Sequence, residues 1–540
     1  MKRILSIGEI VIILVVAIAP VFATFPYRIN IFLSWEGAYR ISEGQLPYRD
    51  FGMPVGYAYW LIPALFFKIF GPFLITLIKA QAFINLLSGF AFRSIFRSIG
   101  ISPGIRFLAV LVFSISYTFP NYWPWYNHTV FVFELIALSF LFRYFFAVRP
   151  RILWIIGAGC LAFFSFFTKQ DGGGLCLLVC LALLIYHCRF YKKWKPLLLF
   201  VAAFVVTAFL LILPFYGTRF GYWFNLGQPP HSSRLSIADI IREFLSASQW
   251  LKFYSFLIAL LVVAMYRRDK ALLKNYQQVI LLLLTAGIFI QAAIFQVTSY
   301  VPVDNNIFFH AFGIAYILYL LAQLELIDWQ QPVVLVTAAA GVLLWWSQVY
   351  WKYIDRFLLP GQQVSIPTHQ YEGHEYSDQV NRHTYMISLD TTDIPLHQWR
   401  VPNSPSFKKI LVPDATADGI ERLQALPLMK KADLKVLNMS ELTPLAKDIP
   451  FKLETGPGYP LWYHKGVGMF DQETDMFVKR INSHHYDVVL FEFIPYLNNF
   501  YPFAVRAALQ QSYLRIDSFP APRKPSSDAW IEVYIKKTVD

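Results

Sequence analysis

The first 52 residues join two segments of opposite character. Residues 1–25, MKRILSIGEIVIILVVAIAPVFATF, begin with two basic residues and continue as a long apolar run. Residues 34–52, SWEGAYRISEGQLPYRDFG, hold three acids and two arginines. A helix needs about 20 apolar residues to cross a bilayer. The first segment therefore predicts an uncleaved first span with its basic end in the cytoplasm, and the second predicts a charged loop on the outer side.

The composition of the whole chain indicates a polytopic membrane protein. Of 540 residues, 56% are hydrophobic and 15% are charged, and the mean hydropathy is +0.45, which excludes an ordinary soluble protein. The net charge of +13 does not indicate nucleic-acid binding, because the basic residues cluster in short loops between apolar runs. The four cysteines lie in or beside apolar runs, so we expect core residues there, not a disulfide framework or a metal site.

Eleven apolar segments are candidates for membrane spans. Basic clusters such as those at 189–195 and 267–274 fall on the side of the N-terminus in this scheme, and the odd number of spans places the C-terminal tail outside. Residues 57–70, YAYWLIPALFFKIF, are too short for a span and are expected to form a juxtamembrane helix. The expected spans are roughly 4–24, 72–93, 105–120, 125–146, 151–169, 173–190, 196–216, 250–266, 277–297, 306–325 and 332–351.

The composition changes after residue 354, where prolines, histidines and mixed charges appear and no further span-length apolar run follows. The segments KILVPDA and YDVVLFEF are typical of buried strands followed by helices, and AWIEVYIKK indicates a late strand. We therefore predict a membrane domain over residues 1–354, whose outer loop at 25–71 carries juxtamembrane helices, and a soluble extracytoplasmic α/β domain over 355–540. The second domain carries no recognisable chemical motif, which favours a scaffold or acceptor-docking role.

Polar residues gather where the predicted spans meet the outer face. Acids, histidine and lysine at the edge of a bilayer are costly unless they are paired or face water, so together they predict a cavity. Lys79 is expected inside the outer half of the second span, where a cation needs an anion such as a carboxylate or a lipid phosphate. Arg219 lies in a second outer loop at 217–249. The other residues of this predicted site are Glu36, Asp50, His128, Lys169, Gln170, Asp171, Asp304 and Asn305.

Several of these residues also have a purely structural interpretation. Glu36 could simply pair with Arg40, one helical turn further on. Asp50, next to Arg49, could cap a turn before Gly52. The remaining structural alternatives are an interfacial histidine at His128, a snorkelling cation at Lys169 and a turn residue at Asp171.

The pattern resembles the GT-C class of membrane glycosyltransferases, in particular the aminoarabinose transferases and protein O-mannosyltransferases. The resemblance rests on the acid Glu36 after the first span, on Gly44 followed by Pro47–Phe51, and on the aromatic segment Tyr57–Phe70 that ends at Gly71. The later Thr168–Gln170 (TKQ) and a soluble domain after the last span also match. This resemblance implies a GT-C-like fold, a polyprenyl-phosphate-linked sugar as donor, and a bacterial inner membrane location with a periplasmic C-terminal domain.

A mechanism follows from the resemblance and the outer-face residues. Glu36 is expected to act as general base on an acceptor hydroxyl, or to orient it. Asp50 is the second expected catalytic residue, which could orient the acceptor or hold a divalent ion such as Mg²⁺ or Mn²⁺. Lys79, Lys169 and Arg219 are the candidates that would stabilise the departing lipid phosphate. The acceptor is left open between glycan, lipid and protein, and the sugar is open as well.

Two other classes of function stay open at this stage. A transporter or flippase for lipid-linked glycans would usually show repeated halves or helices broken at the midplane. The sequence shows no repeat, and its polar residues gather at one face. An outer-face polysaccharide ligase or polymerase is a further alternative, and the position of the acid-rich loop directly after the first span is the best discriminator from it.

Overall fold

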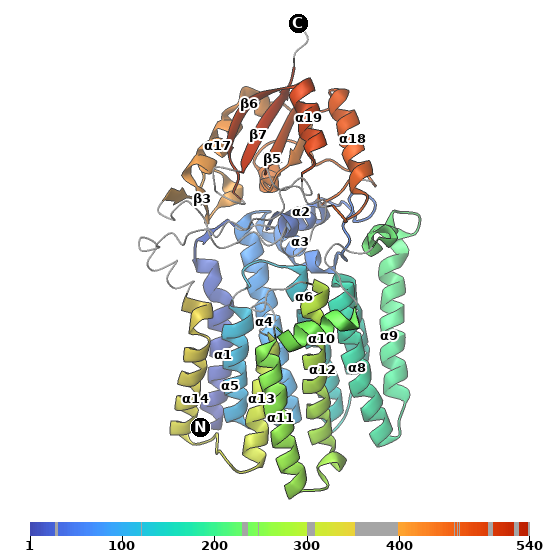
Figure 1. Cartoon of the computed structure of the whole chain (residues 1–540), viewed down its shortest axis with the longest axis vertical. Coiled ribbons are helices and arrows are strands. Elements are labelled where there is room, and N and C mark those ends of the chain that lie inside the picture. The colour runs from blue at the N-terminus through green and yellow to red at the C-terminus, as the bar shows by residue number, and fades with distance from the viewer. Residues whose placement is uncertain are drawn as a thin grey trace. The chain divides into compact units, whose positions relative to one another are not determined.

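A computed structural model shows a mostly helical chain that contains two small sheets (Figure 1). It describes residues 1–27, 31–119, 121–228, 236–246, 248–299, 308–351, 398–457, 459–461, 463, 465–494, 501–522 and 529–537. The chain divides into two compact units, which are treated separately below. The helical unit comprises residues 1–20, 81–214 and 233–353, and the mixed unit comprises 21–80, 215–232 and 354–540. The segment 25–71, predicted to be an outer loop, therefore packs in the same unit as the C-terminal residues after 354.

The helical unit is built from long, roughly parallel helices joined by short connections, and the shorter helix α10 lies across them (Figure 1). The helix α4 is shared, because its first turns belong to the mixed unit. The helices are α1 (Lys2–Ile18), α4 (Leu74–Ile99), α5 (Pro103–Phe113), α6 (Tyr126–Phe146), α7 (Ile152–Thr168), α8 (Gln170–Tyr191), α9 (Lys195–Ile212), α10 (Ile237–Ser246), α11 (Gln249–Arg268), α12 (Tyr276–Ser299), α13 (Phe308–Gln323) and α14 (Pro332–Trp345).

Helices occupy all eleven positions at which spans are expected. Seven of the described helices are long and apolar enough to cross a membrane. The segments Pro103–Thr118, Ile152–Thr168, Phe308–Gln323 and Pro332–Trp345 are apolar but shorter. The structure thus confirms a polytopic helical architecture, while the count of eleven stays a prediction.

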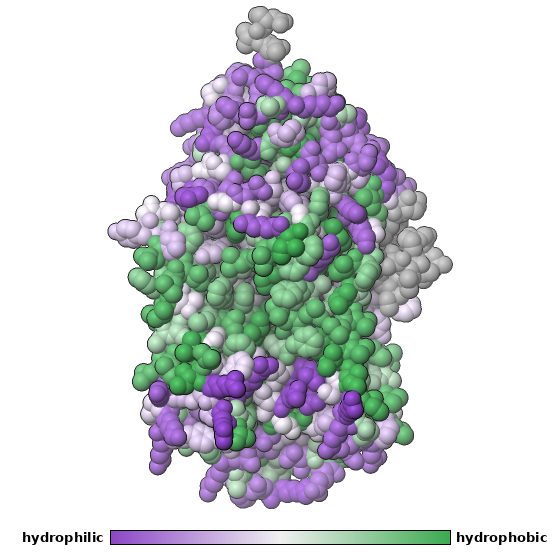
Figure 2. All heavy atoms as spheres, turned by 180° about the vertical axis from the view of Figure 1, so that it is seen from behind, coloured by the Kyte–Doolittle hydropathy of each residue, from purple (hydrophilic) through white to green (hydrophobic). Residues whose placement is uncertain are grey.

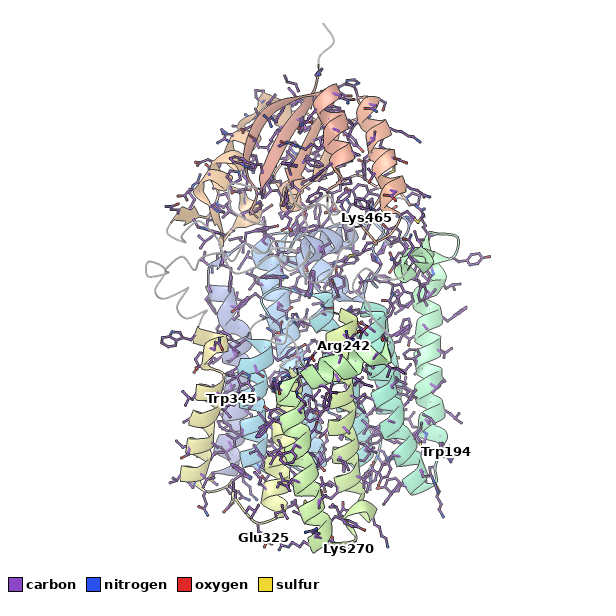
Figure 3. The ribbon with its side chains drawn as sticks, in the orientation of Figure 1. Trp194, Arg242, Lys270, Glu325, Trp345 and Lys465 are labelled. Atoms are coloured by element: carbon purple, nitrogen blue, oxygen red, sulfur yellow. The ribbon has the colours of Figure 1, made fainter. Side chains whose placement is uncertain are left out.

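The surface of the helical unit has the character of a membrane domain. Large hydrophobic side chains such as Leu198, Phe256 and Val336 are exposed on its helices, and Figure 2 shows a broad hydrophobic band bordered below by hydrophilic side chains. Figure 3 places Lys270 and Glu325 together at one end of the helices. Charged loops at the helix ends and apolar sides between them are what a bilayer requires.

Buried polar pairs join the helices of this unit. Glu9 of α1 is fully buried and accepts hydrogen bonds from Arg93 Nε at 2.6 Å and from Arg106 Nε at 2.8 Å, so three helices share one ion cluster. Deeper in the unit, Gln291 of α12 donates to the buried Glu134 of α6 at 2.6 Å. Removing one partner of such a pair would leave a polar group unpaired in an apolar interior, which is strongly unfavourable.

The mixed unit contains two sheets. In the first, the short β1 (Phe25–Pro26) pairs in parallel with β3 (Ile410–Pro413), which also pairs with β2 (Trp399–Arg400). In the second, the strand order is β4-β5-β7-β6, with β4 and β5 parallel and the other pairs antiparallel. The further elements are α2 (Ile31–Ser42), α3 (Ala58–Phe70), η4 (Phe220–Gly227), α17 (Asp414–Ala425), β4 (Val436–Met439), α18 (Phe470–Asn482), β5 (Val488–Phe493), α19 (Phe503–Ser512), β6 (Tyr513–Pro520) and β7 (Trp530–Lys536).

Residues 222–225 contact the C-terminal segment 466–473 in this unit. Asn225 of η4 donates to the Gly466 carbonyl at 2.8 Å and accepts from the Gly468 N–H at 2.6 Å. The Tyr222 hydroxyl donates to Glu473 Oε1 of α18 at 2.7 Å. Burial raises the pKa of Glu473 to about 7, although the hydrogen bonds from Tyr222 and from the Met469 N–H act in the opposite direction.

Candidate active site

The predicted catalytic segment folds as α2, whose position is set by a tryptophan of α3. The Trp60 indole lies so close to α2 that a Cβ at Gly37 would be 2.0 Å from its ring. The Trp60 Nε1–H donates to the Leu33 carbonyl at 3.0 Å. Trp35, on the same helix, donates through Nε1 to the Pro72 carbonyl at 2.9 Å. The helix that carries Glu36 is therefore fixed by two indole hydrogen bonds and by one close contact that only glycine allows.

Glu36 forms a buried ion pair with Arg40 on the same helix. The Arg40 Nη2 and Nε atoms lie 2.6 and 2.9 Å from Glu36 Oε1. The exposed fraction of the side chain is 0% for Arg40 and 6% for Glu36. The structural alternative for Glu36, a pairing one turn along a helix, is thus observed. Both Arg40 donors bind the same oxygen, so Glu36 Oε2 is not used by this pair.

Arg40 also connects the first loop to the C-terminal tail within the mixed unit. Its Nη1 donates to Gln45 Oε1 at 2.9 Å and to the Glu454 carbonyl at 2.7 Å. Its guanidinium lies 4.8 Å from the ring centroid of Tyr459 and 5.4 Å from that of Phe51. Aromatic faces stabilise a cation that has left water. Every element around Arg40 therefore favours a fixed position for the carboxylate that it holds.

The surroundings of Glu36 change its acidity. Burial raises the pKa of the Glu36 carboxyl above its ordinary value, while the charge and the hydrogen bonds of Arg40 act in the opposite direction. The hydroxyls of Tyr459 and Tyr463 form a buried pair in the same region, in which Tyr463 donates at 3.1 Å. A carboxyl with a raised pKa is better suited to accept a proton near neutral pH than an ordinary surface glutamate.

Asp50 has a different environment. Its carboxylate accepts from Arg49 at 2.6 and 3.0 Å and from the Leu46 N–H at 2.8 Å. The hydrogen bonds from Arg49 are the largest cause that lowers the pKa of Asp50 below its ordinary value. This geometry is that of a turn residue, as the structural alternative states. The catalytic role of Asp50 stays a prediction.

Two predicted phosphate-binding cations lie in the mixed unit. Lys79, on the second turn of α4, is half-buried and places its Nζ 4.8 Å from the Phe70 ring centroid. Among the described residues it forms no ion pair. Arg219 precedes η4 and donates to the Pro457 carbonyl at 3.4 Å. Among the described residues, Arg219 is thus the one of these two cations with a hydrogen bond to the C-terminal region.

The helical unit carries a second cluster, centred on Lys169. Lys169 Nζ lies 3.1 Å from Asp171 Oδ2, which also accepts from the Thr298 hydroxyl at 2.8 Å. The same ammonium lies 4.7 Å from the Phe295 ring centroid and 5.7 Å from that of Tyr126. Residues of α6, α8 and α12 thus surround one cation at the junction between α7 and α8.

Two further predicted residues, Gln170 and His128, lie in the helical unit. Gln170 begins α8, directly after Lys169. His128 lies in the first turn of α6 and is half-buried, and its carbonyl accepts from the Tyr117 hydroxyl at 2.9 Å. Asp304 and Asn305 lie outside the described residues. The predicted site residues therefore form a group in each unit, and their roles stay predictions.

The tail residues around Arg40 were not found by sequence reasoning. Glu454, Tyr459 and Tyr463 come from the segment 452–463, which is rich in glycine, proline and aromatic residues but carries no known catalytic motif. The concentration of aromatic residues in this segment was the feature of the sequence that could have marked it as a candidate part of the site. The possible divalent ion also stays a prediction, since the part of the chain that the structure describes holds no group of three or more potential metal-ligand side chains.

Comparison with known proteins locates the fold. No protein-family profile and no curated protein matches the chain in sequence. Two solved structures match over nearly the whole length: ArnT from Cupriavidus metallidurans in the apo state, with a TM-score of 0.55 and 12% identity, and the same protein bound to undecaprenyl phosphate, with a TM-score of 0.51 and 11% identity. The matches cover 98% and 99% of this chain and 97% and 98% of the ArnT chains, respectively.

The chain has the ArnT fold. The similarity to ArnT confirms the predicted GT-C-like architecture of a multi-pass helical membrane domain with a C-terminal α/β domain. At this low identity the likeness to ArnT concerns the fold, so the chemistry has to be argued from the residues of this chain.

Proposed function

We propose that this protein is a membrane glycosyltransferase that moves a sugar from a polyprenyl-phosphate donor to an acceptor on the extracytoplasmic face. The observation that carries the proposal is the match over 99% of the chain to ArnT bound to undecaprenyl phosphate. Because a fold can host unrelated functions, the proposal also needs support from the residues of this chain. Glu36 offers the base, and the cations Lys79 and Lys169 offer the positive charge, that transfer of a sugar from a lipid phosphate requires.

In this proposal Glu36 is the general base. It would accept a proton from the acceptor hydroxyl through Oε2, because both Arg40 hydrogen bonds go to Oε1. Burial raises its pKa, and Arg40 keeps enough attraction to orient it. The acceptor oxygen then attacks the sugar carbon, and the bond between that carbon and the phosphate oxygen breaks. The electron pair leaves with the polyprenyl phosphate.

The departing phosphate needs positive charge. Lys79 suits this role because its described contacts include an aromatic ring and no carboxylate. Lys169 is already paired with Asp171, so it would contribute less new attraction. Arg219 remains a third candidate. We place the protein in the bacterial inner membrane with its C-terminal domain in the periplasm, which puts the positively charged loops in the cytoplasm.

Binding and turnover test separate parts of this proposal. Purified protein is mixed with undecaprenyl phosphate, and the Lys79→Ala variant is compared with Lys68→Ala, which removes an exposed lysine of α3. We expect weaker binding for the first variant and unchanged binding for the second. Equal affinity in both would remove Lys79 from the phosphate site, and no binding by the unaltered protein would refute the donor class.

Turnover is measured in liposomes as loss of sugar from a panel of polyprenyl-phosphate sugars, with a bacterial envelope extract as acceptor source. Glu36→Gln keeps the size of the side chain and a hydrogen-bond acceptor for Arg40 but removes the base. We expect no transfer, with normal folding and normal undecaprenyl phosphate binding. Normal turnover by this variant would exclude Glu36 as the base.

A further inference from the structure

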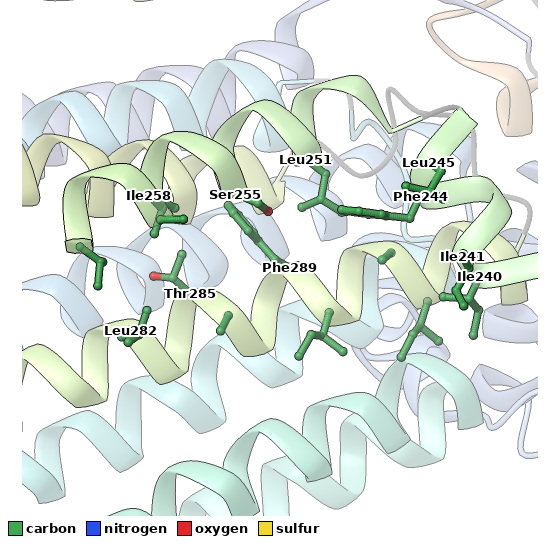
Figure 4. Close-up of a pocket in the computed structure, with 16 residues that line it drawn as sticks. Ile240, Ile241, Phe244, Leu245, Leu251, Ser255, Ile258, Leu282, Thr285 and Phe289 are labelled. Atoms are coloured by element: carbon green, nitrogen blue, oxygen red, sulfur yellow. The ribbon is translucent and has the colours of Figure 1, made fainter. Parts of the chain in front are cut away.

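The helical unit contains an apolar groove whose lining shares no residue with the two clusters described above. It has a volume of about 630 Å³ and lies between α10, α11 and α12 (Figure 4). Ile241 and Leu245 of α10, Ile258 and Ala259 of α11, and Phe289 and Ile294 of α12 are among the residues that line it. The groove is thus formed by two candidate spans and by one amphipathic helix.

The lining of the groove selects for hydrocarbon. None of its sixteen described lining residues is charged, and Ser255 and Thr285 supply the hydroxyls. The Thr285 hydroxyl already donates to the Leu281 carbonyl at 2.9 Å. A sugar, nucleotide or free phosphate would leave its polar groups without partners here, which is unfavourable. An apolar chain would instead gain contacts along the whole groove.

The length of the groove matches one leaflet. Its lining on α12 runs from Leu282 to Ile294, a rise of about 18 Å at 1.5 Å per residue. Half of a hydrocarbon core is about 15 Å thick. A single acyl chain of a bilayer lipid therefore fits this depth, whereas the many-unit, methyl-branched chain of a polyprenyl carrier is longer and wider.

One cation lies at an end of the groove. Lys252, at the start of α11, donates to the Leu245 carbonyl at 2.6 Å, and Leu245 and Leu251 both line the groove. The phosphate of a lipid headgroup complements a lysine at this position.

We propose that this groove binds one acyl chain of a glycerophospholipid, with the lipid phosphate near Lys252. The bound lipid would also support the Lys169 cluster. Ala293 and Ile294 of α12 line the groove, and the next residue, Phe295, places its ring 4.7 Å from the Lys169 ammonium. Filling the groove would therefore restrict the helix that completes this cluster.

The test is lipid retention, measured by native mass spectrometry of the full chain. Delipidated protein is incubated with phosphatidylethanolamine, phosphatidylglycerol or undecaprenyl phosphate in separate samples. Ala259→Trp fills the groove, and Ala264→Trp introduces the same change at an exposed position of α11 that does not line it. We expect phosphatidylethanolamine retention to fall about tenfold in the first variant and to stay unchanged in the second.

Two further measurements complete the test. Ala286→Phe fills the groove from α12 and replaces Ala259→Trp if that variant does not fold. Lys252→Glu should weaken phosphatidylethanolamine retention without filling the groove. The proposal would be overturned if both groove variants retained as much phosphatidylethanolamine as the unaltered protein. It would also be overturned if the groove variants lost undecaprenyl phosphate and kept phosphatidylethanolamine. Because undecaprenyl phosphate binding by the unaltered protein is read separately, failure here leaves the proposed glycosyl transfer intact.

Discussion

Two acid–base pairs, one from each unit, differ in which partner is held in place. In the mixed unit, Glu36 and Arg40 lie on one helix and are sealed from solvent, and the arginine has further contacts that hold the carboxylate in place. In the helical unit, the side chains of Lys169 and Asp171 are each about one-seventh exposed. The Lys169 ammonium is held by the Asp171 carboxylate and by the faces of two aromatic rings. The first arrangement suits a fixed base, and the second suits a cation that can meet an anionic ligand.

Removing Arg40 should have the largest effect on this comparison. Arg40→Ala leaves the Glu36 carboxyl buried without its cation and also removes the hydrogen bond to Glu454, so we expect a loss of about 3–5 kcal/mol. Thermal unfolding in detergent measures the change. Arg49→Ala, which removes an exposed arginine that pairs with Asp50, is the control and should change stability by less than about 1 kcal/mol. Equal losses in both variants would mean that burial does not distinguish the two pairs.

Glu473 extends the comparison of Glu36 and Asp171 to a buried acid without a paired cation. It is held by hydrogen bonds from Tyr222 and the Met469 N–H, and it forms no ion pair among the described residues. Its pKa is about 7 in the folded protein and 4.5 ordinarily, so the folded state binds the proton more tightly. Its stabilising contribution is complete below pH about 4.5 and is lost as the pH rises through about 7, with an upper limit of about 3 kcal/mol. The melting temperature should fall between pH 5 and 8.

The control for this pH dependence uses the same helix. Glu473→Gln should remove most of the decrease in melting temperature, whereas Asp471→Asn, an exposed change on α18, should preserve it. A decrease of the same size in Glu473→Gln would show that another group titrates.

Gly37 tests how closely the helix of Glu36 must approach α3. Gly37→Ala places a methyl group 2.0 Å from the Trp60 ring, and we expect a loss of about 1–3 kcal/mol because the indole must move. Gly341→Ala is the matched control, since a Cβ there meets nothing within 4 Å, and it should be neutral or stabilising by up to about 1 kcal/mol. If both variants unfold at the same temperature, the Trp60 contact is not restrictive.

The smallest effect is expected in the helical unit. Asp171→Asn removes the charge of a partly exposed pair, and we expect about 1 kcal/mol or less of lost stability. Calorimetry or a thermal-shift assay measures it next to Arg40→Ala. A loss as large as that of Arg40→Ala would contradict the distinction between a sealed pair and an accessible one.

Local patterns predicted much of this fold because they report on short stretches of chain. Run length located the helices of the membrane domain. The strands β3, β5 and β7 were also visible as apolar runs. The pattern of apolar residues within a short stretch shows which of its side chains are buried, and all of these elements bury apolar side chains.

The contacts between distant segments could not be predicted in this way. The strand β1 has only two residues, so its pairing with β3 leaves no periodic signal. The residues around Arg40 come from a loop more than 400 positions later, and Glu454 contributes a backbone carbonyl that any residue could supply. The sequence indicated Glu36 and its possible partner Arg40, but the long-range packing that buries both becomes visible only in three dimensions.

The pairing of Phe25 with Ile410 has a consequence for how the protein is made. At a synthesis rate of about 5–20 residues per second, the ribosome needs on the order of tens of seconds to deliver the second strand after the first. During this interval β1 lacks its pairing strand, and α2 lacks the C-terminal residues that contact it in the folded unit. This unit can therefore complete its fold only late in synthesis.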